Sequence, residues 1–312
     1  MNLETLTSIL SETLRAATPL VLAALGELIS EKAGVLNLGV EGMMLVGAVS
    51  GFIAASVTGN IILGLLVAIV AGIAIALIHA ILAIGLAADR VATGLALTIF
   101  GTGLSAFIGE GYVGKTIAGL QPIGIPLLKS IPVIGAALFN QDILVYASVV
   151  LVILVWWWLR QTRTGLVLRS IGESPDSAEA LGLPVIGMRY LAVLFGGALA
   201  GLAGAYLSLA YTPLWAENLT AGRGWIAIAL VVFATWKPER LLFGAYLFGG
   251  GVSAIQLILP AIGVIISPYL LSCLPYLATI LVLAIISRDA TRIQLGAPPS
   301  LEQPFRPINY KL

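Results

Sequence analysis

The stretch Gly109–Thr116 has the residue types and spacing of a phosphate-binding loop. Its sequence GEGYVGKT fits the pattern G-x-x-x-x-G-K-[ST]. Such a loop cradles phosphates with backbone N–H groups only when a strand precedes it and a helix follows it. Here an apolar segment of helix length precedes the motif, and Gly119 and Pro122 follow it. We interpret the match as a coincidence and predict that no ATP binds there.

Metal and acid–base chemistry have few candidate residues. His79 is the one histidine and Cys273 the one cysteine, too few for a Cys/His metal cluster or a disulfide framework. No H-E-x-x-H or G-x-S-x-G signature occurs. His79 lies in an apolar run, where an ionisable residue is a functional candidate by default. The alternative that we favour is a neutral imidazole hydrogen-bonded between helices. We expect no catalytic residue and no metal site.

The segment Glu31–Met44 holds a second candidate. Asn37 is placed to cap the helix that follows, and Glu41 would then lie in its first or second turn. A carboxylate at that depth is costly unless it is paired or hydrated. Two interpretations stay open. Glu41 is either a gate or pathway carboxylate, or a helix-terminus charge paired with Lys32 or with backbone amides.

The stretch 169–184 has the start and stop signals of a short, independent helix. Ser174 suits the N-cap, Pro175 the first helical position and Asp176 the first turn, where the helix dipole favours a negative charge. Gly182 suits the residue that ends a helix, and the proline that follows prevents continuation. The sequence therefore predicts a helix of about two turns.

So short a helix is marginal alone in water and must pack against something. The small side chains of Ala178 and Ala180, together with Leu181, suit insertion into a groove of another protein. The alternative is a surface helix that lies on the membrane or on its own subunit.

Composition indicates which kind of secondary-structure element holds these candidate residues in place. The 312 residues are 59% hydrophobic and 10% charged, against about 25% charged in soluble domains. The stretches Gly42–Ala88 and Leu241–Ser287 contain no Asp, Glu, Lys or Arg. Runs of that length exceed what a buried soluble helix needs, so the chain is predicted to be a polytopic membrane protein. The balance of 16 basic and 15 acidic residues gives no sign of nucleic-acid binding.

The fold class predicted is an all-α transmembrane bundle of about nine spans, within a range of roughly eight to ten. No segment alternates with a period of two, as strands of a membrane barrel would. The segment 225–236 is too short to cross alone and is read as a half-helix or as part of a longer element. The predicted spans are 13–29, 38–57, 61–86, 91–109, 143–159, 190–212, 225–236, 241–259 and 269–286.

Orientation follows from the positive loops. Basic residues concentrate in the connection 160–189 and in the tail 287–312. If both are cytoplasmic, and if successive spans cross the membrane in alternating directions, all but four of the 16 basic residues lie on the cytoplasmic side. The external four are Arg15, Lys115, Lys129 and Arg223. This arrangement needs an external amino terminus. The number of spans changes by one if residues 1–12 form a surface helix or if one segment is re-entrant.

The chain reads as a single transmembrane domain, residues 1–312. Its external Gly/Pro-rich loop, 110–142, is expected to dip into the membrane or to pack on the external mouth.

Two segments in corresponding positions of the two halves resemble each other. Gly94–Gly109 and Gly222–Trp236 are both short spans that begin with glycine, a pattern that marks the pathway in some repeat-built transporters. The repeats G-x-x-x-G at 47–51 and 197–201 predict close helix packing.

Two segments carry a family resemblance. EKAGVLNLGVEGMMLVGA (31–48) resembles the nucleoside and simple-sugar branch of the permease subunits of ABC importers in the ribose/branched-chain amino acid permease superfamily. GLVLRSIGESPDSAEALGLPV (165–185) is similar to the cytoplasmic coupling segment of that superfamily. The resemblance covers nearly the whole chain and implies a type II importer-like fold. The residues it assigns to ATPase coupling are Arg169, Gly172, Glu173, Ser174, Pro175, Asp176, Ala178, Glu179, Ala180, Leu181 and Gly182.

The resemblance also implies partners. They are an ATP-hydrolysing subunit that uses ATP and Mg²⁺, an extracytoplasmic solute-binding protein, and a second, homologous permease that makes a heterodimer. This chain itself is expected to bind no cofactor. It would lie in a bacterial or archaeal cytoplasmic (inner) membrane with its C-terminus in the cytoplasm.

The expected solute is small, neutral and polar, and a nucleoside is preferred. Few fixed charges lie in the predicted spans, and Tyr211, Trp215 and Trp225 are placed to stack a flat base, unless they form an aromatic belt. A simple sugar or a branched-chain amino acid is the alternative, and a secondary transporter or channel is the competing class. The residues expected to line the pathway are Asn37, Glu41, Thr98, Thr102 and Trp225.

Overall fold

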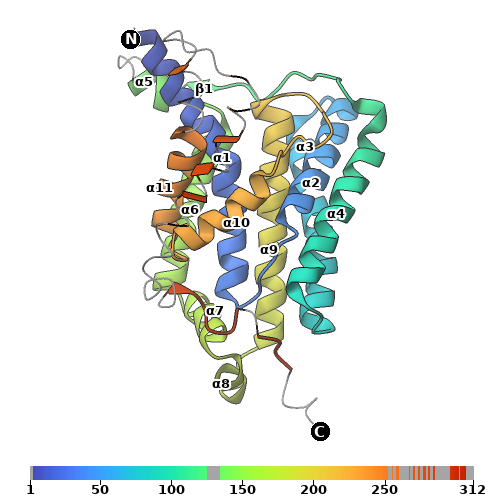
Figure 1. Ribbon diagram of the computed structural model, residues 1–312, viewed down its shortest axis with the longest axis vertical. Helices are drawn as coiled ribbons and strands as arrows, with labels where there is room; N and C mark the ends of the chain where they lie inside the picture. Colours follow the sequence, from blue (N-terminus) through green and yellow to red (C-terminus); the bar gives the residue numbers. More distant parts are fainter. Residues whose placement is uncertain are drawn as a thin grey trace.

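The computed structural model describes residues 3–124, 134–251, 296–301 and 303–306, with scattered positions between 255 and 284. Its described part is a bundle of long helices (Figure 1). Helices α7 (Arg163–Glu173) and α8 (Pro175–Ala180) lie at one end. Strand β1 (Ile123–Gly124) and the amino terminus lie at the opposite end. These are called the α8 end and the β1 end below.

Six helices in the described ranges are long and apolar enough to cross a membrane. They confirm the first six predicted spans, and they make the chain a multi-pass membrane protein. Two of them are prolonged by π-helical turns, η1 (Ile81–Gly85) after α3 and η4 (Leu207–Tyr211) after α9. The six are α1 (Leu3–Lys32), α2 (Val40–Thr58), α3 (Ile61–Ala80), α4 (Arg90–Gly109), α6 (Ile143–Gln161) and α9 (Val185–Tyr206).

Helix α1 runs without a break from Leu3 to Lys32. The possibility that residues 1–12 form a separate surface helix is therefore wrong for the residues that the structure describes. Most residues of α1, α2 and α9 are buried, whereas only a minority of the residues of α3, α4 and α6 are, so these three helices form an outer surface of the bundle. Large apolar side chains such as Ile99 and Phe107 lie on this outer surface, as expected for helices that face lipid or another subunit.

Helix α10 (Arg223–Phe233) has 11 residues. At about 1.5 Å per residue it covers roughly half of a 30 Å hydrocarbon layer. The prediction of a half-helix near 225–236 is thus confirmed. Thr235 and Trp236 end it with positive φ angles of 49° and 54°, and the chain continues into α11 (Pro238–Ala245) and the π-helical η5 (Tyr246–Gly250).

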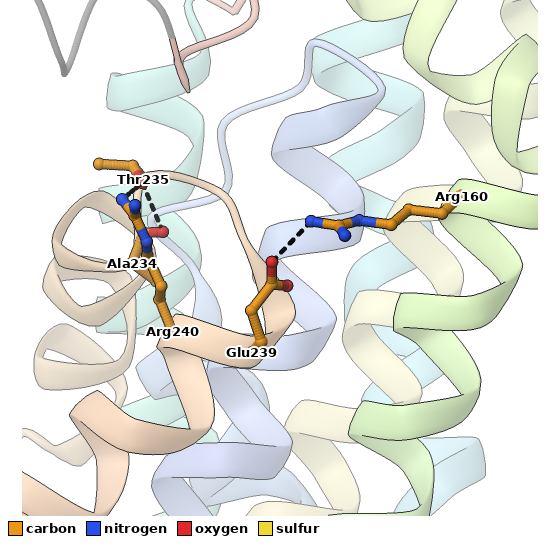
Figure 2. A network of polar contacts seen from close by, with 5 residues as sticks. All are labelled: Arg160, Ala234, Thr235, Glu239 and Arg240. Atoms are coloured by element: carbon orange, nitrogen blue, oxygen red, sulfur yellow. Dashed lines mark hydrogen bonds and ion pairs between the residues drawn. The ribbon is translucent and has the colours of Figure 1, made fainter.

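The turn between α10 and α11 is joined to its surroundings by polar contacts (Figure 2). Arg160 of α6 forms an ion pair with Glu239 at 2.7 Å. Arg240 donates to the Thr235 hydroxyl at 2.8 Å, and that hydroxyl donates to Ala234 O at 2.7 Å. After residue 251 the structure describes scattered positions of the predicted spans 241–259 and 269–286, and the rest of these two spans lies outside the described residues.

Glycines bring three helices together. A Cβ atom at Gly47 of α2 would overlap the backbone of Gly201 on α9, and a Cβ at Gly72 of α3 would overlap Gly197 and Gly201. Gly201 is therefore in backbone contact with α2 on one side and α3 on the other. This confirms the close packing predicted from the two G-x-x-x-G repeats.

The Gly/Pro-rich loop packs along the β1 end. Its backbone pairs with the residues after α9, through Gly114 N to Trp215 O (2.9 Å) and Ile117 N to Pro213 O (3.1 Å). Strand β1 pairs antiparallel with β2 (Asn140–Gln141), and the short helix α5 (Ile134–Leu138) lies between them in the chain. The motif Gly109–Thr116 begins at the end of a membrane-length helix, and the described chain after it runs without a helix to strand β1, which is not the strand–loop–helix context of a phosphate-binding loop.

The predicted likeness of Gly94–Gly109 to Gly222–Trp236, as two short interrupted spans, is wrong. Gly94–Gly109 lies inside the uninterrupted 20-residue α4, whereas Gly222–Trp236 is a half-helix and its turn. The interruption in the first half instead precedes α2. It is residues 33–39, between α1 and α2.

Candidate functional site

The connection between α1 and α2 turns back along α1. Val35 N donates to Ser30 O at 3.1 Å, and Asn37 N donates to a carboxylate oxygen of Glu27 at 2.8 Å, so the chain retraces the last turns of α1. We name residues 33–39 the re-entrant segment. Its course from the end of α1 to the start of α2 is visible in Figure 1. It delivers the first turn of α2 to the interior of the bundle.

Neighbouring helices fix the re-entrant segment through its carbonyl groups. His79 Nε2 lies 3.1 Å from Leu36 O, and Thr98 Oγ1 donates to Leu38 O at 2.9 Å. His79 is fully buried, in keeping with the favoured interpretation of a hydrogen-bonded structural imidazole. Its partner is the re-entrant segment rather than a second helix.

Glu41 lies in the first turn of α2 and is 4% exposed. Its carboxylate accepts hydrogen bonds from Thr220 Oγ1, from Gly222 N at 2.8 Å and from Gly224 N at 2.6 Å. The amides belong to the N-terminus of the half-helix α10, whose N-cap is Gly222. The positive end of the helix dipole and three donors therefore stabilise a buried negative charge.

The close approach at Glu41 depends on glycine. A Cβ atom at Gly224 would come within 2.6 Å of the Cα and of a carboxylate oxygen of Glu41, so only glycine fits there. Gly222 has a positive φ of 77°, which glycine adopts without strain. The beginnings of α2 and α10 thus meet at one carboxylate.

The helix-terminus interpretation of Glu41 holds for backbone amides and is wrong for Lys32. Lys32 Nζ donates instead to Gly296 O at 3.2 Å. The prediction that Asn37 caps α2 is wrong too, because the cap residue is Gly39 and no side chain caps that helix. Asn37 Oδ1 accepts from Gly39 N at 2.9 Å and shapes the turn before the helix.

Four of the predicted pathway residues gather around the re-entrant segment. Asn37 and Glu41 lie in it or directly after it, and Thr98 is bonded to it. Trp225 follows Gly224, which contacts Glu41. Thr102 lies one turn further along α4, is exposed, and donates to Thr98 O within its own helix. Whether these residues line a pathway stays a prediction.

The expected stack of aromatic side chains is not present as predicted. Trp215 is fully buried in a cluster with Phe52 and Leu209, so it presents no face to a solute. Tyr211 donates its hydroxyl to Glu12 at 2.6 Å. Only Trp225, 36% exposed, keeps an accessible ring.

Two buried carboxyl groups near the α8 end were missed as site residues. Glu31 accepts from Trp236 Nε1, and Glu27 accepts from Asn37 N. Both side chains are 1% exposed. Their i, i+4 spacing on an apolar helix was the available signal, because it places both carboxyl groups on one helix face.

The predicted short helix is α8, and its caps are confirmed. Ser174 Oγ accepts from Ser177 N at 3.3 Å, and Pro175 occupies the first helical position. Gly182 has a φ of 76°, its amide donates to Glu179 O at 2.8 Å, and the next amide donates to Ala178 O at 3.0 Å. This pair of bonds is the Schellman motif, in which a left-handed glycine ends a helix.

The face that α8 presents differs from the prediction. Ala178 is 2% exposed and packs with Ile171, Val185 and Phe305 of its own chain, so its role as an inserting residue is wrong. Leu181 is 80% exposed, and Ala180 is exposed beside it. The outward apolar face is therefore Ala180 and Leu181, while Ala178 packs the helix against the bundle.

The remaining predicted coupling residues lie either within α8 or next to it. Gly172 is buried, and a Cβ atom there would overlap Lys32 O. Arg169 and Glu173 line a cleft of about 490 Å³ beside α8, together with Lys32 and Leu181. Asp176 is exposed and Glu179 is half-buried. No group of His, Cys, Asp and Glu suited to a metal ion occurs in the part of the chain that the structure describes.

Comparison with known proteins agrees with this architecture. Residues 9–286 match the family described as the permease component of branched-chain amino acid transport systems. The chain is 44% identical to a protein of Haloferax volcanii named "putative glucose ABC transporter permease protein", over 95% of this chain and 97% of that one.

Two further relatives have names that refer to nucleosides. A nucleoside ABC transporter permease protein of Lactococcus lactis is 32% identical, over 90% of this chain and 92% of its own length. A guanosine ABC transporter permease protein of Bacillus subtilis is 35% identical, over 89% and 91%. All three relatives are similar to this chain along nearly its whole length.

Proposed function

The chain belongs to the permease-component family of branched-chain amino acid transport systems, and from that premise we propose that it forms the transport pathway of an ATP-driven importer for a small polar solute. The observation that carries the proposal is α8. It is a capped helix of six residues at one end of a bundle of membrane-length helices, with Leu181 80% exposed. An exposed, pre-ordered apolar contact of this kind suits docking to an ATP-hydrolysing subunit.

The proposed topology places the α8 end in the cytoplasm and has about nine crossings. Several basic residues that the loop rule assigns to the inside meet at this end, since Lys32, Arg90 and Arg189 all bond to residues 296–303. At the other end, Arg15 and Arg223 both lie over the Tyr211 ring. The C-terminus is then cytoplasmic.

The proposed partners occupy both ends and one side of the bundle. An ATPase subunit binds at α8, a solute-binding protein binds the packed loop at the β1 end, and a second permease of different sequence completes the pathway. The exposed side of α4 supports this last point, because Thr102 lies there among large apolar residues. A polar side chain is better accommodated at a subunit interface or pathway than in lipid.

We propose a nucleoside as the solute. The names of two relatives support it, as does Trp225 with its accessible ring beside the Glu41 site. A simple sugar is the second candidate, and the relative at 44% identity, whose name refers to glucose, favours it. A secondary transporter or channel would work without ATP hydrolysis.

The test is uptake into proteoliposomes that contain this chain, its ATPase, its partner permease and its binding protein. We expect uptake of labelled nucleoside that requires hydrolysable ATP and that excess unlabelled nucleoside suppresses. Suppression by glucose or ribose alone would replace the nucleoside with a sugar. Uptake driven by an ion gradient without ATP would overturn the importer proposal itself.

A further inference from the structure

Residues 296–301 and 303–306, here named the C-terminal strap, lie across the α8 end (Figure 1). Ser300 donates to Gly172 O twice, from its amide at 3.2 Å and from its hydroxyl at 2.7 Å. Gly172 lies near the end of α7, directly before α8. Phe305, 8% exposed, shares an apolar cluster with Ala178 of α8. The strap therefore packs against the end of α7 and against α8.

The strap also contacts the re-entrant segment through Arg189. This arginine is 1% exposed, and Nε donates to Ala33 O at 3.0 Å. Its Nη2 donates to the Ser300 hydroxyl at 3.3 Å, and its guanidinium lies 5.3 Å from the centre of the Phe305 ring. One rigid fork of donors thus joins the strap to the beginning of the re-entrant segment.

Arg90 repeats this arrangement from α4. It is 7% exposed, and Nη1 donates to Gly34 O at 2.7 Å. The same guanidinium donates to Leu301 O and, at 2.8 Å, to Gln303 O. Both arginines therefore hold the strap and the re-entrant segment together, Arg90 through backbone carbonyl groups and Arg189 through Ala33 O and the Ser300 hydroxyl.

Detaching the strap would leave buried guanidinium donors without these acceptors. An unsatisfied buried polar group is costly, and a charged one more so. The strap and the re-entrant segment are thus expected to move together. The re-entrant segment continues directly into Glu41, which binds the N-terminus of α10.

We propose that Ser300, held by Arg189 and Arg90, is the positioning residue through which movement of α8 reaches the re-entrant segment and, through Glu41, the half-helix α10. The proposal rests on the proposed function, in which α8 receives the ATPase. The physical route runs from Gly172 to Ser300, then through Arg189 to Ala33. It gives the C-terminal region a role in coupling that the α8 sequence alone does not provide.

The test compares Ser300→Ala, Ser300→Thr and Gln303→Ala in the complete importer in proteoliposomes. We expect Ser300→Ala to assemble in wild-type amounts and keep its basal ATP hydrolysis, yet to lose about tenfold in solute taken up per ATP, a typical magnitude for coupling between sites. Ser300→Thr keeps a hydroxyl and should restore coupling. Gln303→Ala should match the wild type, because only the backbone of this exposed residue is used.

The outcomes separate the two proposals. A normal uptake-to-ATP ratio for Ser300→Ala, beside a working wild type, would overturn the role of the strap and leave the importer intact. A wild type without ATP-dependent uptake would overturn the proposed function and this inference with it.

A second measurement avoids any loss of assembly by the Ser300 variant. Spin labels at the exposed residues Glu173 and Gln303 report whether the strap follows the end of α7. We expect the same distance between the labels with and without bound ATP. A distance that changes between the two states would show that strap and coupling segment move apart, which contradicts the proposal.

Discussion

At the scale of single residues, Glu41 is the charge on which two interrupted elements depend. It accepts three hydrogen bonds from the start of α10 while it belongs to the start of α2. Glu27, in contrast, bonds a backbone amide of the re-entrant segment next to its own helix. Glu41 therefore joins the two halves of the chain, as Glu31 does near the α8 end through Trp236 Nε1.

Replacing Glu41 with Gln should weaken this junction. The amide keeps one acceptor and turns an N–H₂ group toward a backbone donor, so we expect a loss of stability of about 1–3 kcal/mol. Thermal unfolding of the purified complex in detergent measures it, and uptake should fall in parallel. The same change at the exposed Glu110 is the control. Equal melting temperatures for the two variants would contradict the assigned role of Glu41.

Gly182 makes a second prediction at this scale. Its left-handed conformation costs a residue with a Cβ atom about 1–2 kcal/mol, although no neighbouring atom would obstruct that Cβ. Gly182→Ala should therefore fray the end of α8 and lower solute-stimulated ATP hydrolysis. Gly187→Ala is the matched control, because that glycine is also unobstructed but lies within helix α9. Stimulation that is unchanged in Gly182→Ala would contradict the need for an ordered end of α8.

At the scale of elements, α8 and its cap residue Leu181 expose one apolar face and bury Ala178. Leu181→Asp should leave the bundle folded, because the side chain is 80% exposed, yet prevent binding of the ATPase subunit. Co-purification of that subunit measures the effect. Val113→Asp, at an exposed apolar residue of the opposite end, is the control and should retain the ATPase. Retention of the ATPase by Leu181→Asp would remove α8 from the interface.

Ala178→Trp acts differently from Leu181→Asp. Since Ala178 packs inside its own chain, a large side chain there should destabilise the packing of α8 against the bundle and not only its contact with a partner. Limited proteolysis near α8 distinguishes the two variants. We expect faster cleavage in Ala178→Trp and wild-type cleavage in Leu181→Asp.

The elements show which features a sequence can predict. The caps of α8 were predictable, because Ser174, Pro175 and Gly182 act on their immediate neighbours. The orientation of Ala178 was not, because it depends on Phe305, far along the chain. Backbone amides were one predicted type of partner for Glu41, but which amides was not predictable for the same reason, since the bonds join residues 41 and 220–224. Length predicted that 225–236 does not cross alone, and the structure decides between the two alternatives in favour of a half-helix.

At the scale of the whole molecule, the two ends differ in what they offer to partners. The β1 end is closed by backbone pairing between the Gly/Pro-rich loop and the residues after α9. The α8 end exposes Leu181 and a cleft lined by Lys32, Arg169 and Glu173. This asymmetry supports the orientation proposed from the basic residues.

Single cysteines test that orientation. In a Cys273→Ser background, Lys115→Cys should react with an impermeant thiol reagent from outside. Arg163→Cys and Arg306→Cys should react only after the membrane is opened. All three positions are exposed. The reverse pattern would invert the topology and place α8 on the wrong side for an ATPase.

The junction at Glu41 has a further consequence for how the molecule opens. If α10 moves away from α2, three donors that now bind one carboxylate lose their acceptor in the interior of the bundle. Such donors must find oxygen atoms elsewhere, from water or from hydroxyl groups of a solute. Separation of the two helices is therefore linked to wetting of the space between them. A dry, empty opening is the least stable state, and a hydroxyl-rich cargo lowers the free energy of the movement that admits it.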